Sequence, residues 1–81
     1  MATIVGEVLD RFTGQPISGA IIEVDGYTAV SNPDGSFTIS LPGGEYTITA
    51  HAPGYDTETE YVSVHGTTHV TILLTPIVHT L

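Results

Sequence analysis

The sequence has no cysteine and no lysine, and Arg11 is its only strongly basic side chain. Without cysteine, neither a disulfide nor a thiolate metal site can stabilise the 81-residue chain, so it depends on side-chain packing and backbone pairing. Nine Asp and Glu residues give the chain a net charge of −8. This charge argues against nucleic-acid binding, which needs clustered Lys and Arg, and against attachment to an anionic membrane surface.

Long apolar runs are also missing. No run approaches the ~18 residues of a membrane-spanning helix, so no membrane insertion is expected. The first residues, Met1 to Gly6, lack the charged and apolar regions of a signal peptide. The chain is therefore either cytoplasmic or derived from a precursor whose leader has been removed or left out. The Gly-x-Ser-x-Gly motif of nucleophilic hydrolases is absent too, and the sequence predicts no enzyme.

Short turn motifs divide the chain at intervals of about ten residues, which is typical of a sandwich or barrel of antiparallel strands. These motifs are Thr13–Pro16, Asp25–Gly26, Asn32–Gly35, Pro42–Gly44, Pro53–Gly54 and His65–Gly66. The β-branched residues Thr, Val and Ile, which favour strands, make up 29 of the 81 residues. We therefore expect strands at residues 3–9, 20–25, 27–31, 36–41, 45–52, 57–64 and 68–75.

Apolar and polar residues alternate within these strands, which predicts one buried and one solvent-facing side. The expected inner set is Ile4, Val8, Ile22, Val24, Phe37, Ile39, Leu41, Tyr46, Ile48, Ala50, Val70, Ile72 and Leu74. The strand at 57–64 departs from the pattern, because Glu58 and Glu60 share their parity with Val62 and Val64. Either a bulge near Tyr61 changes the phase of this strand, or its first half projects beyond the core.

Five motifs follow one another in a characteristic order: Ile4–Asp10, Thr13–Ala20, Asp34–Phe37, Leu41–Tyr46 and Ala52–Tyr55. This order resembles that of the carboxypeptidase regulatory-like domain. The resemblance implies an all-β fold over residues 1–75, a seven-stranded antiparallel Greek-key β-sandwich of the transthyretin-like (prealbumin-like) type. It also implies a non-catalytic accessory module, so no active-site residue is carried over from the family.

Calcium is a candidate ligand because the chain is acidic and several carboxylates lie close together in the sequence. Asp56, Glu58 and Glu60 are spaced about 6.6 Å apart along one strand, and Asp10 and Asp34 at turns can complete a set of oxygen ligands. Alternatively, the turn aspartates bind their own backbone and the strand acids face water. The histidines are interpreted as solvated residues; they are His51, His65, His69 and His79.

Residues 76–81 form a tail that follows the last part of the family pattern and contains the apolar residues Ile77, Val78 and Leu81. The tail either caps the end of its own sandwich or adds as a strand to the edge of another copy. Head-to-tail addition of this kind does not close and would build a filament. These three residues are therefore the predicted interface.

Several functions remain open at this level. The first is an extracellular or cell-surface structural or adhesive module that acts by protein–protein contact, copies of itself included, and assembles through an edge strand or the tail. The second is a regulatory domain excised from a metallocarboxypeptidase or another cell-surface protein. The third is a calcium- or carbohydrate-binding accessory module. The aromatic candidates for sugar contact are Phe12, Tyr27, Tyr55 and Tyr61.

Overall fold

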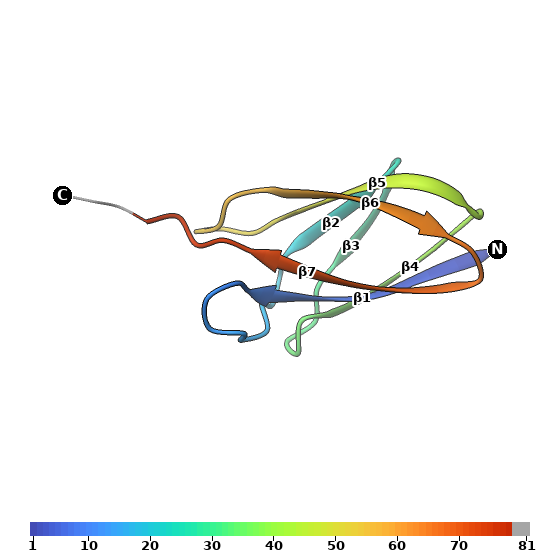
Figure 1. The fold of residues 1–81 in the computed structure, drawn as a ribbon. Coiled ribbons are helices and arrows are strands. Elements are labelled where there is room, and N and C mark those ends of the chain that lie inside the picture. Colours follow the sequence, from blue (N-terminus) through green and yellow to red (C-terminus); the bar gives the residue numbers. More distant parts are fainter. Residues whose placement is uncertain (79–81) are drawn as a thin grey trace.

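The computed structural model describes residues 1–78 and contains seven strands in two sheets. The three-stranded sheet has the order β4-β1-β7, with bounds Ser36–Leu41, Ala2–Asp10 and Thr67–Leu74. The four-stranded sheet has the order β3-β2-β5-β6, with bounds Tyr27–Val30, Ile21–Val24, Gly44–His51 and Glu58–Val64. The two sheets pack face to face (Figure 1), which confirms the predicted all-β sandwich. Within residues 1–78 there is no helix long and apolar enough to cross a membrane.

The core lies between the sheets and is built from the alternate positions that the sequence predicted. Its largest fully buried side chains are Phe37, Ile4, Ile22, Leu41, Ile48, Ile72, Leu74, Val8, Val24 and Val64. Tyr46 and Val70, which were also expected inside, are half-buried and pack against this core. Because burial of each large apolar side chain is worth about 1.5–3 kcal/mol, this set supplies the main favourable contribution to folding.

The hairpin between β2 and β3 shows how local sequence sets the register. Asp25 and Gly26 have φ values of 45° and 86°, and the flanking residues Val24 and Tyr27 are paired. Positive φ at both central residues is the requirement of a type I′ turn, whose twist matches that of the two strands. The predicted two-residue turn is thus confirmed.

Strand β6 has no bulge, since its pairing with β5 runs without interruption from Gly44↔Val64 to Ala50↔Glu58. Val62 and Val64 are buried, whereas Glu58 and Glu60 on the same side are half-buried. Of the two interpretations of this strand, the second is therefore correct: its first half lies at the margin of the core. β6 is also an edge strand, where inward-pointing charge discourages unwanted pairing.

Four of the five strand pairs are antiparallel, as predicted, whereas β1 and β7 are parallel. A short turn forces neighbouring strands to be antiparallel, but β1 and β7 are connected through the rest of the chain, so either direction is open to them. Both strands run toward the same end of the molecule (Figure 1). The N-terminus and the end of β7 therefore lie at opposite ends of the sandwich.

Candidate functional site

Asp10 is the centre of a hydrogen-bonded junction at the end of the sandwich from which the tail leaves. This buried carboxylate accepts bonds through Oδ1 from the backbone N–H groups of Phe12 (2.8 Å) and Thr13 (3.0 Å), and through Oδ2 from the Tyr55 hydroxyl (2.9 Å). These hydrogen bonds hold the pKa of Asp10 below its ordinary value of 3.8, and the bond from the Thr13 N–H contributes most to this shift. Burial opposes the shift. The hydrogen bond with Asp10 in turn raises the pKa of the Tyr55 hydroxyl above its ordinary value of 10.0.

Arg11 joins three strands at the same end. Its backbone N–H donates to the carbonyl oxygen of Leu74 at 2.9 Å, and its Nε donates to Thr75 Oγ1 at 2.9 Å. Its Nη2 donates at 3.3 Å both to the carbonyl oxygen of Leu73 and to Glu58 Oε2. The only strongly basic side chain of the sequence thus connects the end of β1 to β6 and β7.

The tail pairs first with its own domain. Pro76 forms a bridge with Tyr55, the Asp56 N–H donates to Thr75 O at 2.9 Å, and the Ile77 N–H donates to Gly54 O at 2.9 Å. The side chains that follow Pro76 are nevertheless open to solvent, with Ile77 46% exposed and Val78 75% exposed. The third predicted interface residue, Leu81, lies outside the described residues, as does His79.

Exposed apolar residues occur on the two segments that are joined at this end. Phe12 is 67% exposed and lies in the loop whose N–H groups bind Asp10, while Asp10 also binds Tyr55 beside Pro76. The loop and the tail are therefore held at one end of the molecule. We call the exposed residues Phe12, Ile77 and Val78 the tail-end surface.

The five predicted calcium ligands are not brought into one cluster. Asp34 binds within its own turn, where Oδ1 accepts bonds from the Ser36 hydroxyl (2.6 Å) and the Ser36 N–H (3.0 Å), and these bonds lower the pKa of Asp34. The oxygens of Asp10 are bonded as described above, and Glu58 lies beside Arg11. The other two residues of the predicted set are Asp56, whose N–H donates to Thr75 O, and Glu60 on β6. In the described part of the chain no group of three or more His, Cys, Asp or Glu side chains could hold a metal ion, and calcium binding stays a prediction from sequence.

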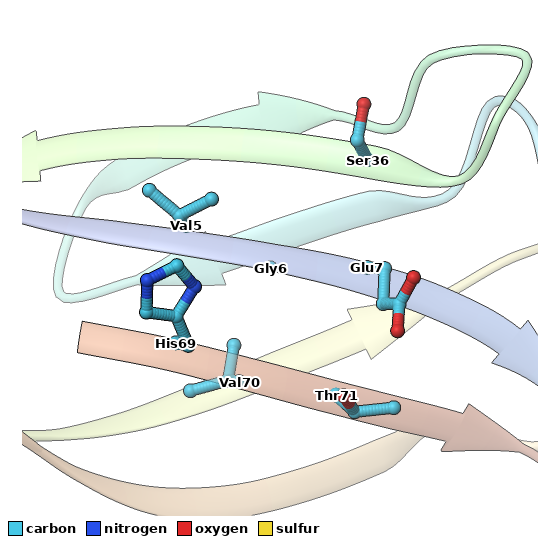
Figure 2. A pocket seen from close by; sticks show the side chains of 7 residues that line it. All are labelled: Val5, Gly6, Glu7, Ser36, His69, Val70 and Thr71. Carbon is cyan, nitrogen blue, oxygen red and sulfur yellow. The ribbon is translucent and has the colours of Figure 1, made fainter.

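A shallow depression of about 280 Å³ lies along β1 and β7, next to the start of β4. Figure 2 shows the His69 ring beside Val5 and the Glu7 carboxylate at the far end of the depression. Ser36 and Thr71 lie on the Glu7 side, away from the imidazole. No hydroxyl of this depression is therefore paired with His69 as a nucleophile would be with its base.

Residues 3–75 match the carboxypeptidase regulatory-like domain. The chain belongs to this family. The resemblance seen in the sequence is therefore confirmed over nearly the whole chain. A comparison with curated proteins finds no match.

Solved structures similar to this regulatory-like domain come from unrelated settings. A chain of a type II cohesin–X-dockerin complex from Acetivibrio cellulolyticus has a TM-score of 0.79 and 23% identity, over 91% of this chain and 57% of that one. The 5-hydroxyisourate hydrolase of Klebsiella pneumoniae has a TM-score of 0.73 and 24% identity, over 94% and 91%. The minor pilin of Streptococcus agalactiae has a TM-score of 0.76 and 17% identity, over 99% and 46%. At these identities the likeness shows the fold, and the domain spans about half of the first and third chains.

Some features of this regulatory-like domain could not be found from sequence. Arg11 bonds to residues more than sixty positions away, and no local pattern marks such partners. The aromatic candidates for sugar contact do not share one surface. Phe12 and Tyr55 lie at the tail end, Tyr27 follows the β2–β3 turn, and Tyr61 lies on the opposite side of β6 from Val62 with 90% of its surface exposed.

Proposed function

We propose that this carboxypeptidase regulatory-like domain is a non-catalytic module of an extracellular or cell-surface protein and acts by contact with other proteins, copies of itself included. The observation that carries the proposal is the tail-end surface. Its three exposed apolar residues, Phe12, Ile77 and Val78, belong to two segments that are joined through Asp10, Tyr55 and Pro76. We infer that these residues form one patch, and exposed apolar patches are a feature of protein-contact surfaces.

The acidic residues support a non-catalytic role. A catalytic carboxylate needs free access to substrate and a pKa suited to proton transfer. Asp10 and Asp34 instead bind backbone and hydroxyl groups of the fold, which lower their pKa values, and Glu58 lies beside Arg11. The similarity to a hydrolase, at 24% identity, extends to the fold alone.

The similar structures support the contact role in a general way. One is a chain from a cohesin–X-dockerin complex and another is a minor pilin. The cohesin–X-dockerin complex favours contact between different proteins, and the pilin favours contact between protein subunits. For this domain we infer contact through the tail-end surface, with a second copy of the chain as the partner to test first.

Sedimentation velocity over a range of protein concentrations tests this inference. We expect the native chain to associate as concentration rises, and we expect Val78→Ser to weaken that association. Val30→Ser is the matched control, because Val30 is also an exposed valine (59%) but lies on β3, which pairs with β2 and not with the tail. A monomer at every concentration, or equal weakening by both substitutions, would contradict self-contact at this surface.

A second candidate is an accessory domain that contacts a neighbouring domain of a longer protein. The observation that favours it is the length of the similar chains, of which this one spans 57% and 46% in two cases. Contact within one polypeptide would use the same tail-end surface, since the chain leaves the sandwich there. A native chain that stays monomeric, but binds the domain encoded next to it less tightly after Val78→Ser, would favour this candidate.

A further inference from the structure

The parallel strands β1 and β7 form one ladder of hydrogen bonds that runs from one end of the domain to the other. Eight residue pairs connect these strands, from Thr3↔Thr67 to Asp10↔Leu74. The chain enters at the Thr3 end of this ladder and leaves at the Leu74 end (Figure 1). Tension between the two ends of the domain therefore acts along the ladder and pulls β1 and β7 past each other.

This geometry loads all eight pairs together. In a parallel ladder the bonds are evenly spaced, so they share a force directed along the strands. A force directed across the strands would instead open one pair at a time. We propose that this domain bears tension between its two ends, with the β1–β7 ladder as its mechanical clamp. This role is independent of the partner contact proposed above.

The surrounding strands strengthen the clamp. β1 is the central strand of its sheet, because it also pairs with β4 through six residue pairs from Ala2↔Leu41 to Glu7↔Ser36. The Phe37 ring of β4 and the Val70 side chain of β7 both lie against Gly6 of β1. Sliding β7 along β1 must therefore separate side chains that connect all three strands.

The inner faces of the two strands resist sliding for a second reason. Ile4, Val8, Ile72 and Leu74 are each no more than 1% exposed. A shift of β7 along β1 moves its apolar side chains out of their sites in the core before new contacts can form. Close-packed interiors tolerate such displacement poorly. The transition state for forced unfolding should therefore require both broken backbone bonds and exposed apolar surface.

The exit of the chain is fastened as well. Tension on the tail acts first on the hydrogen bonds of Ile77 with Gly54 and of Asp56 with Thr75. It acts next on the bonds of Arg11, which binds Thr75 through Nε and Leu74 through its backbone N–H. At the other end of the ladder the Thr3 N–H donates to Gly66 O at 2.7 Å. Both ends of the clamp are thus anchored by bonds outside the ladder.

Single-molecule force spectroscopy on the whole chain tests the proposal through two pulling directions. Both use a handle at the N-terminus, and the second handle is attached to a single introduced cysteine, which is unambiguous because the sequence contains none. Val78→Cys places that handle beyond β7, so that the ladder is loaded along its length. Thr67→Cys places it at the start of β7, opposite Thr3, so that the pairs are opened in turn.

We expect the unfolding force to be several-fold higher with the handle at 78 than with the handle at 67, at the same loading rate, because forced unfolding follows the barrier along the pulled direction. Both positions are exposed, and thermal melts of the two variants should agree. If Thr67→Cys lowers the melting temperature, His65→Cys in the preceding turn replaces it, since that residue is exposed as well. Equal forces in the two directions, or a lower force with the handle at 78, would overturn the proposal.

Discussion

Gly6 lies in direct contact with the ring of Phe37. A Cβ atom placed on Gly6 would lie 2.4 Å from Phe37 Cζ and 2.7 Å from Val70 Cγ2, both shorter than real contacts allow. Phe37 is only 2% exposed and therefore has little room to move away. Any side chain at residue 6 would therefore force Phe37 or Val70 to shift.

We expect Gly6→Ala to lower the free energy of unfolding by about 1–3 kcal/mol, as overpacking of a filled core does. Urea denaturation measures this loss. In a Phe37→Leu background the further loss from Gly6→Ala should be smaller, because leucine lacks the ring atoms that the new methyl group meets.

Gly14→Ala is the matched control for the Gly6 experiment. Gly14 has a φ of 74° and open space around its Cβ position, so alanine there is strained by backbone conformation alone. Its loss of stability should therefore be the same in the native and Phe37→Leu backgrounds. If the losses from Gly6→Ala and Phe37→Leu simply add, the contact between these two residues is not the cause.

Acid should destabilise the domain partly through Asp10. Its pKa is lowered in the folded state, so the unfolded chain binds more protons, and stability falls as pH drops from about 5 through 3.8 and below. Asp10→Asn should make this fall shallower, and Tyr55→Phe should do so to a smaller extent because the backbone bonds to Asp10 remain. The urea midpoint measured from neutral pH down to about pH 2 checks both. An unchanged acid slope in Asp10→Asn would show that Asp10 does not contribute.

The inner face of each strand could be predicted because side chains alternate with a period of two and only one face is buried. Phe37 and Ile39 on β4, and Ile22 and Val24 on β2, are buried for this reason. The direction of β7 relative to β1 could not be predicted in the same way. A period of two is identical in both directions, and no short turn connects these strands.

The candidate site was predicted less completely than the fold. Asp10 was noticed as an acid at a turn, but sequence does not show that Tyr55, 45 positions away, donates to it. The pairing of Pro76 and Ile77 with Tyr55 and Gly54 depends on where that loop lies after folding. Contacts between distant segments follow from the packing of the sheets and not from local patterns.

The half-buried Glu60 on edge strand β6 should protect the domain from association at a cost in stability. We expect Glu60→Val to raise the free energy of unfolding by about 1 kcal/mol, because an apolar side chain suits the margin of the core better than a carboxylate. The same change should increase aggregation on heating, measured by turbidity, because it removes charge from an exposed edge.

Thr59→Val is the control for Glu60, because Thr59 is the preceding residue and its exposed side chain lies on the other side of β6. Its effect on stability should stay within about 0.5 kcal/mol, as for ordinary surface substitutions. A Glu60→Val domain that is less stable than the native one would show that Glu60 contributes to stability as well as to solubility.

Arg11 should contribute modestly to equilibrium stability despite its many bonds. Its ion pair with Glu58 spans 3.3 Å between side chains that are 42% and 33% exposed, and pairs of this kind contribute about 0–1 kcal/mol. Arg11→Met keeps the apolar stem and the backbone bond to Leu74, but changes the net charge from −8 to −9. We therefore expect Arg11→Met to lower the free energy of unfolding by about 1 kcal/mol at low salt, and we expect this loss to become smaller as salt screens the added repulsion.

Urea denaturation at low and high sodium chloride measures this salt dependence. Glu58→Gln is the reference variant, because it breaks the same ion pair but makes the net charge less negative. A loss from Arg11→Met that is independent of salt would assign its effect to the hydrogen bonds with Leu73 and Thr75 rather than to charge.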